Sequence, residues 1–200
     1  MLEQLVMLKN GQLAEPTYLL TLYSGWLQLR EQMIADETKE TLTAVHESGH
    51  AVMCWLVEMP FEYVTVIPSD DYYGCIKHGP FPPHLADDVE GGPCRATEMF
   101  MDRRMIVLLA GYAAEALYLD PRKPDSDQSS SDISSTVDMT IGRFGSAEQE
   151  GEYVDRMLED AKDSLLRFWP QVVVLSIELL EKKAIEYSDV VSIMESLPND

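Results

Sequence analysis

Residues 42–60 read LTAVHESGHAVMCWLVEMP, which places two histidines four residues apart with a glutamate directly after the first. On an α-helix, positions i and i+4 lie on one face, so the rings of His46 and His50 can both reach one ion. Glu47 then lies beside the same site, where its carboxylate can accept a proton from a water without binding the metal. The spacing indicates a zinc-binding catalytic helix. It also fits an ordinary buried or surface helix whose histidines have other partners.

The sequence around this stretch predicts a long helix followed by a small β element. Acidic residues in the first turn and Pro60 at the end are typical of a helix over residues 36–59. β-Branched and aromatic residues predict a strand in FEYVTVIP, residues 61–68, and a second short strand in YYGCIKH, residues 72–78. The Pro-, Gly- and Asp-rich residues 79–93 predict an exposed loop.

The rest of the chain is predicted to be helical. An apolar helix spans residues 96–119, and a polar, serine-rich stretch separates it from a helix that begins near Asp132. Three more helices are predicted at residues 149–168, 171–184 and 188–197. Residues 1–35 predict one or two short amphipathic helices. The expected fold is mainly α with a small β element, arranged as an N-terminal helical segment (1–35) and one domain (36–200).

A catalytic zinc site needs a third protein ligand and an open coordination position. Metzincins continue the motif with a glycine three residues after the second histidine and a histidine three residues later. This chain has Met53 and Leu56 at those positions, which excludes that class. The residues that stay open as the third ligand are His78, His84, Glu98, Glu115 and Asp132.

Glu115 and Asp132 each have another interpretation besides that of the third metal ligand. Glu115 is a lone carboxylate in the apolar helix LLAGYAAEAL, and an unpaired buried carboxylate is costly, so it should have a partner. A metal-binding histidine needs such a group on its other ring nitrogen. Asp132 begins a helix, where an N-cap or first-turn acid is ordinary.

The charge, the cysteine spacing and the apolar runs of the sequence argue against several classes of protein. The chain has 35 acidic and 15 basic residues and a formal net charge of −20, which argues against nucleic acid as a partner. Its three cysteines have no CxxC spacing, so a disulfide framework is not expected. Instead, we expect a reducing, cytoplasmic compartment. No apolar run is long enough to span a membrane, and the N-terminus lacks a signal-peptide pattern.

Five segments, in order, resemble the peptidase domain of the FtsH family of metalloproteases. They read TAVHESGHAVMCWLV, VTVIPSDDYYG, VLLAGYAAEAL, SSSDISSTVDMTIGRFG and LLEKKAIEYSDVVSIME, and together they cover about residues 38–197. The resemblance implies that His46 and His50 bind one zinc ion per chain, with Asp132 as the third ligand. It also implies that Glu47 is the general base and that Glu115 supports the site.

The resemblance further implies how substrate is held. The strand EYVTVIP matches an edge strand on which an extended peptide can pair, which points to Val64, Thr65, Val66 and Gly74 as substrate-binding residues. Backbone pairing of this kind gives affinity with little sequence preference.

The sequence also departs from the family pattern. No GxxxxGK[ST] phosphate loop is present, so a separate unfoldase or ATPase is the expected source of unfolded substrate. Tyr112 stands where the family helix has arginine. The leading hypothesis is a zinc endopeptidase that acts on unfolded or flexible polypeptides, with a homo-oligomer as one option for its assembly. The alternatives are a peptide-binding module that keeps the fold without cutting, and a metal-free helical interaction protein.

Overall fold

The computed structural model describes residues 39–70, 72–79, 95–119 and 130–197. The helices predicted in residues 1–35, almost all of the 79–93 loop with His84, and most of the serine-rich stretch lie outside the described residues.

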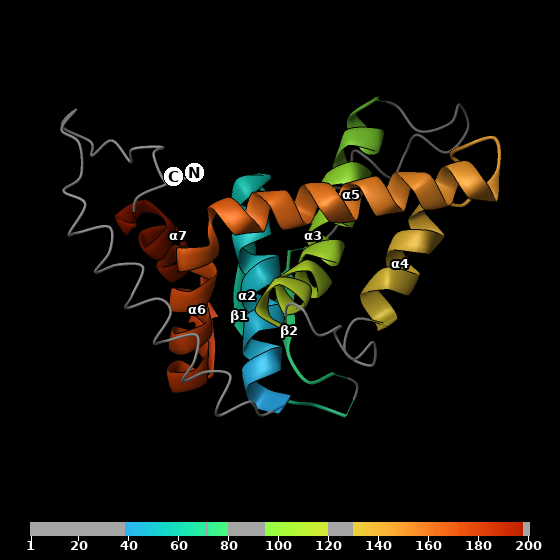
Figure 1. Cartoon of the computed structure of the whole chain (residues 1–200). Helices are drawn as coiled ribbons and strands as arrows, with labels where there is room; N and C mark the ends of the chain where they lie inside the picture. Colours follow the sequence, from blue (N-terminus) through green and yellow to red (C-terminus); the bar gives the residue numbers. More distant parts are fainter. Residues whose placement is uncertain (1–38, 71, 80–94, 120–129, 198–200) are drawn as a thin grey trace, which may run out of the picture.

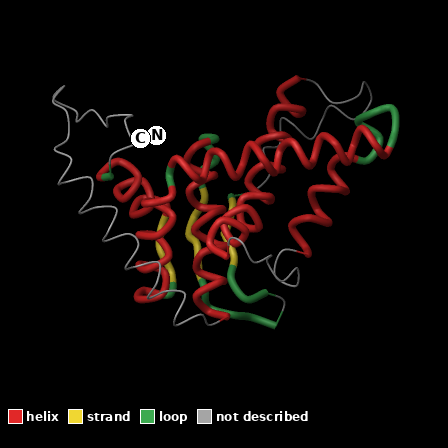
Figure 2. The backbone as a smooth tube through the Cα atoms, in the orientation of Figure 1, coloured by secondary structure: helices red, strands yellow, loops and turns green. Residues whose placement is uncertain are grey.

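The described chain is mainly helical with one small sheet, which confirms the expected fold (Figures 1 and 2). In chain order the elements are α2 (Lys39–Leu56), β1 (Phe61–Thr65), β2 (Cys75–His78), α3 (Arg95–Leu119), α4 (Ser130–Thr140), α5 (Ala147–Arg167), α6 (Trp169–Lys182), β3 (Ala184–Glu186) and α7 (Tyr187–Ser196). None of the helices in the described part of the chain is both long and apolar enough to cross a membrane.

Helix α2 lies at the centre of the fold, between α3 and α6 (Figure 1). Thirteen residues of this helix are buried, and some of them are polar. Neighbouring elements must therefore pack against both faces of α2 and supply hydrogen-bond partners for its polar groups. On the α6 side, the hydroxyl of Ser176 lies 3.1 Å from that of Ser48. On the α3 side, a Cβ added to Gly49 would come within 2.5 Å of the Ala110 carbonyl oxygen. Small residues therefore let α2 and α3 approach closely, and this approach builds the site.

The sheet has the strand order β2-β1-β3, with both pairs antiparallel. Val64 of β1 faces Ile76 of β2 on one side and Ile185 of β3 on the other. The prediction that the EYVTVIP strand is an edge strand is therefore wrong. Both of its backbone edges are already paired, and β2 and β3 are the edge strands.

Strand β3 was not predicted, because the sequence pattern extends the preceding helix to residue 184. The helix instead ends at Lys182, and Lys183 adopts a left-handed conformation with φ 66°. This turn directs the chain back along β1, where the Lys183 carbonyl accepts hydrogen bonds from the Val66 amide at 3.0 Å and the Thr65 hydroxyl at 2.8 Å. The helix predicted to begin near Asp132 is α4, which ends at Thr140, two residues before Gly142 with φ 76°.

Candidate metal centre

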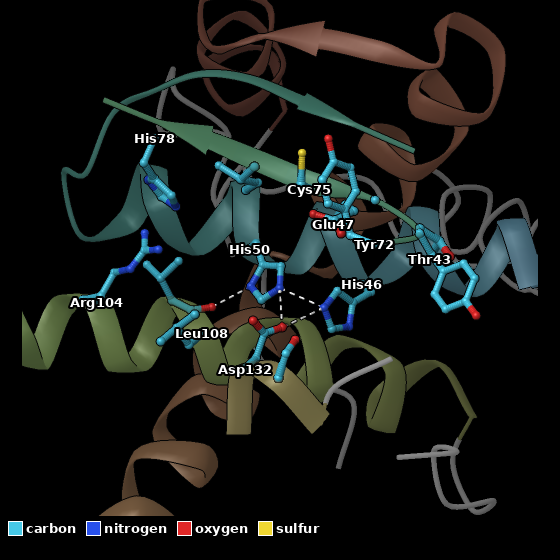
Figure 3. A pocket seen from close by; sticks show the side chains of 15 residues that line it. Thr43, His46, Glu47, His50, Tyr72, Cys75, His78, Arg104, Leu108 and Asp132 are labelled. Atoms are coloured by element: carbon cyan, nitrogen blue, oxygen red, sulfur yellow. Dashed lines mark hydrogen bonds and ion pairs between the residues drawn. The ribbon is translucent and has the colours of Figure 1, made fainter. Parts of the chain in front are cut away.

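Three side chains from two helices converge beside α3 (Figure 3). His46 and His50 lie one turn apart on α2, and Asp132 comes from the first turn of α4. The two histidine Nε2 atoms are 2.8 Å apart. Asp132 Oδ2 lies 3.1 Å from His46 Nε2 and 3.3 Å from His50 Nε2. Among the described residues, these three form the group of side chains whose donor atoms could hold one metal ion.

The other nitrogen of each histidine is fixed by an acceptor. His46 Nδ1 lies 2.7 Å from Glu115 Oε1, and His50 Nδ1 lies 2.6 Å from the Val107 carbonyl oxygen. A carbonyl and an ionised carboxylate can only accept, so each Nδ1 carries the hydrogen and each Nε2 is left with a lone pair in the neutral ring. Two lone pairs and a carboxylate oxygen therefore point at one centre.

Such a centre requires a positive charge. Without a metal, a proton on His46 supplies it: burial opposes that charge, but the hydrogen bonds with Asp132 and Glu115 outweigh burial and raise the pKa of His46 to about 10. Burial would likewise raise the pKa of Asp132, but hydrogen bonds with His46 and His50 outweigh it and hold that pKa well below its usual range. In the metal-free centre the protonated His46 ring is therefore paired with Asp132 and Glu115, and a metal ion would have to displace its Nε2 proton.

The positions of the three donor atoms fit zinc. Ligand atoms 2.0–2.2 Å from a tetrahedral zinc lie roughly 3.3–3.6 Å from one another. Two of the three observed separations, 3.1 and 3.3 Å, are at or near this range. The shortest, 2.8 Å between the histidine nitrogens, needs to widen by about 0.5 Å for that geometry. Two imidazoles and a carboxylate are also among the ligands that zinc takes in catalytic sites.

The two histidine rings lie directly against Gly111 of α3. A Cβ added to Gly111 would lie 2.5 Å from Cε1 and Nε2 of His46 and 2.5 Å from Nε2 of His50. These are the ring atoms that face the centre, so any side chain at this position displaces them. Gly111 is a site residue that the sequence analysis missed, although it lies in the AGYAAE segment of the resemblance.

We therefore expect Gly111→Ala to disrupt the metal centre. The clash should destabilise the fold by about 1–3 kcal/mol and separate the two Nε2 atoms. Gly151→Ala is the matched control, because Gly151 is exposed on α5 and an added Cβ there meets no atom within 4 Å. Thermal unfolding with and without added zinc measures both effects. Equal zinc-dependent shifts in the melting temperature for the two variants would contradict the close packing.

Glu47 is buried beside this centre, and its Oε2 has no hydrogen-bond partner among the described residues. Burial, opposed by the charges of His50 and His46, raises its pKa. On its other side is Gly74, where an added Cβ would lie 2.8 Å from Glu47 Cγ and Oε1. The carboxylate is thus held in place by packing, with its buried Oε2 unpaired among the described residues.

A cavity of about 360 Å³ opens onto Glu47 and the three donors. Its walls come from α2, the segment leading into β2, β2 itself, α3 and α4 (Figure 3). They include Thr43, Tyr72, Gly74, Cys75, His78 and Arg104. Of the four predicted substrate-binding residues, Gly74 lines this cavity. Val64 and Val66 are buried in the hydrophobic core, and the Thr65 hydroxyl bonds to Lys183.

The other candidates for a third ligand lie elsewhere. His78 is on the cavity wall but outside the cluster of donor atoms, and its pKa is lowered to about 4 by burial and by the charges of Arg104 and His50. Glu98 is exposed in the first turn of α3. Glu115 is buried and contacts His46 Nδ1 from behind, on the side away from the centre.

Comparison with known proteins agrees with this geometry. A search of curated proteins gives no match. The sequence profile of Peptidase family M41 matches residues 33–167, which runs from before α2 to the end of α5 and contains all the residues that converge at the centre. The match covers more than half of the chain and confirms the resemblance found in the sequence. The chain therefore belongs to peptidase family M41.

Proposed function

We propose that the protein is a zinc-dependent endopeptidase that cleaves unfolded or flexible polypeptides. His46, His50 and Asp132 would hold one Zn²⁺ per chain, and Glu47 would act as the general base. The observation that carries the proposal is the convergence of two Nε2 lone pairs and a carboxylate oxygen at one centre, with Glu47 next to it. Membership in a peptidase family supports a polypeptide substrate.

Zinc in this position would polarise the scissile carbonyl and lower the pKa of a water to about 7. Glu47, whose carboxylate lines the cavity, would take the proton from the attacking water and deliver it to the leaving amine. Because burial raises the pKa of Glu47, the carboxyl is suited to both steps: it accepts a proton more readily than an exposed glutamate. Glu115 and the Val107 carbonyl would keep the two imidazoles oriented.

The substrate would lie along β2. This strand pairs with β1 on one side and is an edge strand of the described sheet. It borders the cavity through Cys75, Ile76 and His78, and Gly74 directly before it also lines the cavity. An extended peptide can add to such an edge through backbone hydrogen bonds, with its scissile bond facing Glu47. Only a locally unfolded chain can adopt that form, so a separate unfoldase would widen the substrate range. An unfoldase partner, a homo-oligomer and a cytoplasmic location stay predictions from the sequence.

Titration of zinc into metal-free protein tests the metal part of this proposal. At pH 7 the metal-free centre holds a proton on His46, whose pKa is about 10, and zinc must displace it. We expect one zinc per chain, release of about one proton, and an apparent affinity that rises about tenfold per pH unit between pH 6 and 8. Calorimetry in buffers of different ionisation enthalpy measures both numbers. No binding, or binding independent of pH, would contradict the proposal.

A further inference from the structure

The cavity extends beyond the metal centre to a second pair of side chains, Arg104 and His78 (Figure 3). Arg104 lies on α3 one turn before Val107, whose carbonyl binds His50. His78 is the last residue of β2. Figure 3 shows the Arg104 side chain rising from α3 toward His78, on the side of His50 away from Thr43 and Tyr72. An extended peptide along β2 would therefore pass this pair on one side of its scissile bond.

Arg104 brings a fixed positive charge to this end of the cavity. Its guanidinium is always protonated and offers five N–H donors. It makes no hydrogen bond or ion pair with any residue that the structure describes, and the nearest acid on its own helix, Asp102, is engaged by Arg143 at 2.8 Å. His78, with its pKa lowered to about 4, is neutral at pH 7 and adds a hydrogen-bonding group without a competing charge.

The surroundings of Arg104 and His78 favour the binding of an anion at this pair over binding elsewhere in or beside the cavity. Beyond Arg104 and His78 lies a second cavity of about 690 Å³, whose wall is largely apolar and includes Met59, Phe100, Met101 and Met139. At the opposite end, Lys39 lies 3.1 Å above the ring of Tyr73 and is occupied by that contact. At the centre itself, the open position of a bound zinc would be taken by the scissile carbonyl of the substrate. Among the described residues that line this cavity, Arg104 is the arginine or lysine placed to receive an acidic group.

We infer that Arg104, assisted by His78, forms a subsite for a carboxylate of the substrate on the β2 side of the metal centre. Its ligand is either an aspartate or glutamate side chain or the C-terminal carboxylate of a peptide. The inference rests on the proposed function, since it assumes that a peptide lies in this cavity. It gives a chain of net charge −20 a local preference for acidic substrates that its overall charge opposes.

Binding measurements test this subsite separately from catalysis. Zinc-loaded Glu47→Gln protein is titrated with fluorescent peptides that carry glutamate or glutamine at each position in turn, and with peptides ending in a free carboxylate or an amide. At one position, or at the C-terminus, the acidic peptide should bind about tenfold more tightly, as a partly exposed charge-assisted hydrogen bond would give. The position that responds distinguishes a side chain from a terminal carboxylate.

The preference should depend on the positive charge of Arg104. Adding Arg104→Met to this protein should reduce the ratio of affinities to about one, and Arg104→Lys should retain part of it. Arg167→Met removes the same charge from an exposed residue of α5 that lines neither cavity, and it should leave the ratio unchanged. Equal ratios in the Arg104→Met and Arg167→Met proteins, or no peptide binding at all, would overturn the subsite.

Cleavage of the same peptides by the wild-type protein separates the two proposals. Cleavage without any acidic preference would leave the endopeptidase proposal standing and overturn the subsite. An Arg104-dependent binding preference without cleavage would support the subsite and overturn the catalytic proposal.

Discussion

Replacing Glu47 by glutamine is expected to abolish peptide hydrolysis while the zinc content stays at one ion per chain. Glutamine has nearly the same shape, so it should keep the close contact that Glu47 makes with Gly74. It cannot accept the proton of the attacking water. Loss of a positioned general base lowers a rate by about 10²–10⁴-fold.

The measurement is the cleavage of an unfolded protein such as casein, with metal content determined on the same samples. Glu98→Gln is the matched control, because Glu98 is an exposed acid on α3 far from the cluster of donors, and it should keep wild-type activity. Equal cleavage by the wild-type and Glu47→Gln proteins would rule out Glu47 as the base. A wild-type protein that binds zinc and peptide but does not cut would favour the binding-module alternative.

Replacing Asp132 by asparagine is expected to weaken zinc binding more than any other single change outside the two histidines. The substitution removes the negative charge whose Oδ2 lies 3.1 and 3.3 Å from the histidine nitrogens and offers zinc a weaker neutral ligand. Glu115→Gln should have a smaller effect, about 10–100-fold, because Glu115 contacts only the far nitrogen of His46. For Asp132→Asn we expect a loss beyond about 100-fold.

Competition with a chromophoric zinc chelator measures these affinities in parallel. Asp138→Asn is the control, because Asp138 is exposed on the same helix α4 and its substitution removes the same charge. If Glu115→Gln proved more damaging than Asp132→Asn, the assignment of the third ligand would be reversed. If Asp138→Asn matched Asp132→Asn, the effect would come from general electrostatics and not from ligation.

Much of the site could be predicted because it depends on local spacing. The positions of His46, Glu47 and His50 follow from one helical repeat, and the structure places them beside one cavity. The cost of burying a lone carboxylate predicted a partner for Glu115, and His46 Nδ1 lies 2.7 Å from it. Asp132 could not be chosen from the residues alone, because a first-turn acid has an ordinary explanation. The resemblance was needed to single it out.

The parts that were missed depend on contacts distant in sequence. β3 has only three residues, and it exists because Lys183 turns the chain so that Ile185 can face Val64, more than 100 residues earlier. The resemblance predicted that the strand at residues 61–68 is an edge strand, and β3 is the strand that pairs with its second edge. Gly111 was missed for a similar reason. Its role comes from the distance between two helices, which no spacing within one helix reveals.

The most direct test of the account is the rate of casein cleavage as a function of zinc occupancy. Metal-free wild-type protein is reloaded in steps, and zinc content and rate are measured on each sample. The account predicts a rate near zero without zinc that rises in proportion to occupancy and reaches its maximum at one zinc per chain. Cleavage that does not change with zinc content, or protein that holds one zinc per chain and cuts no peptide, would contradict it.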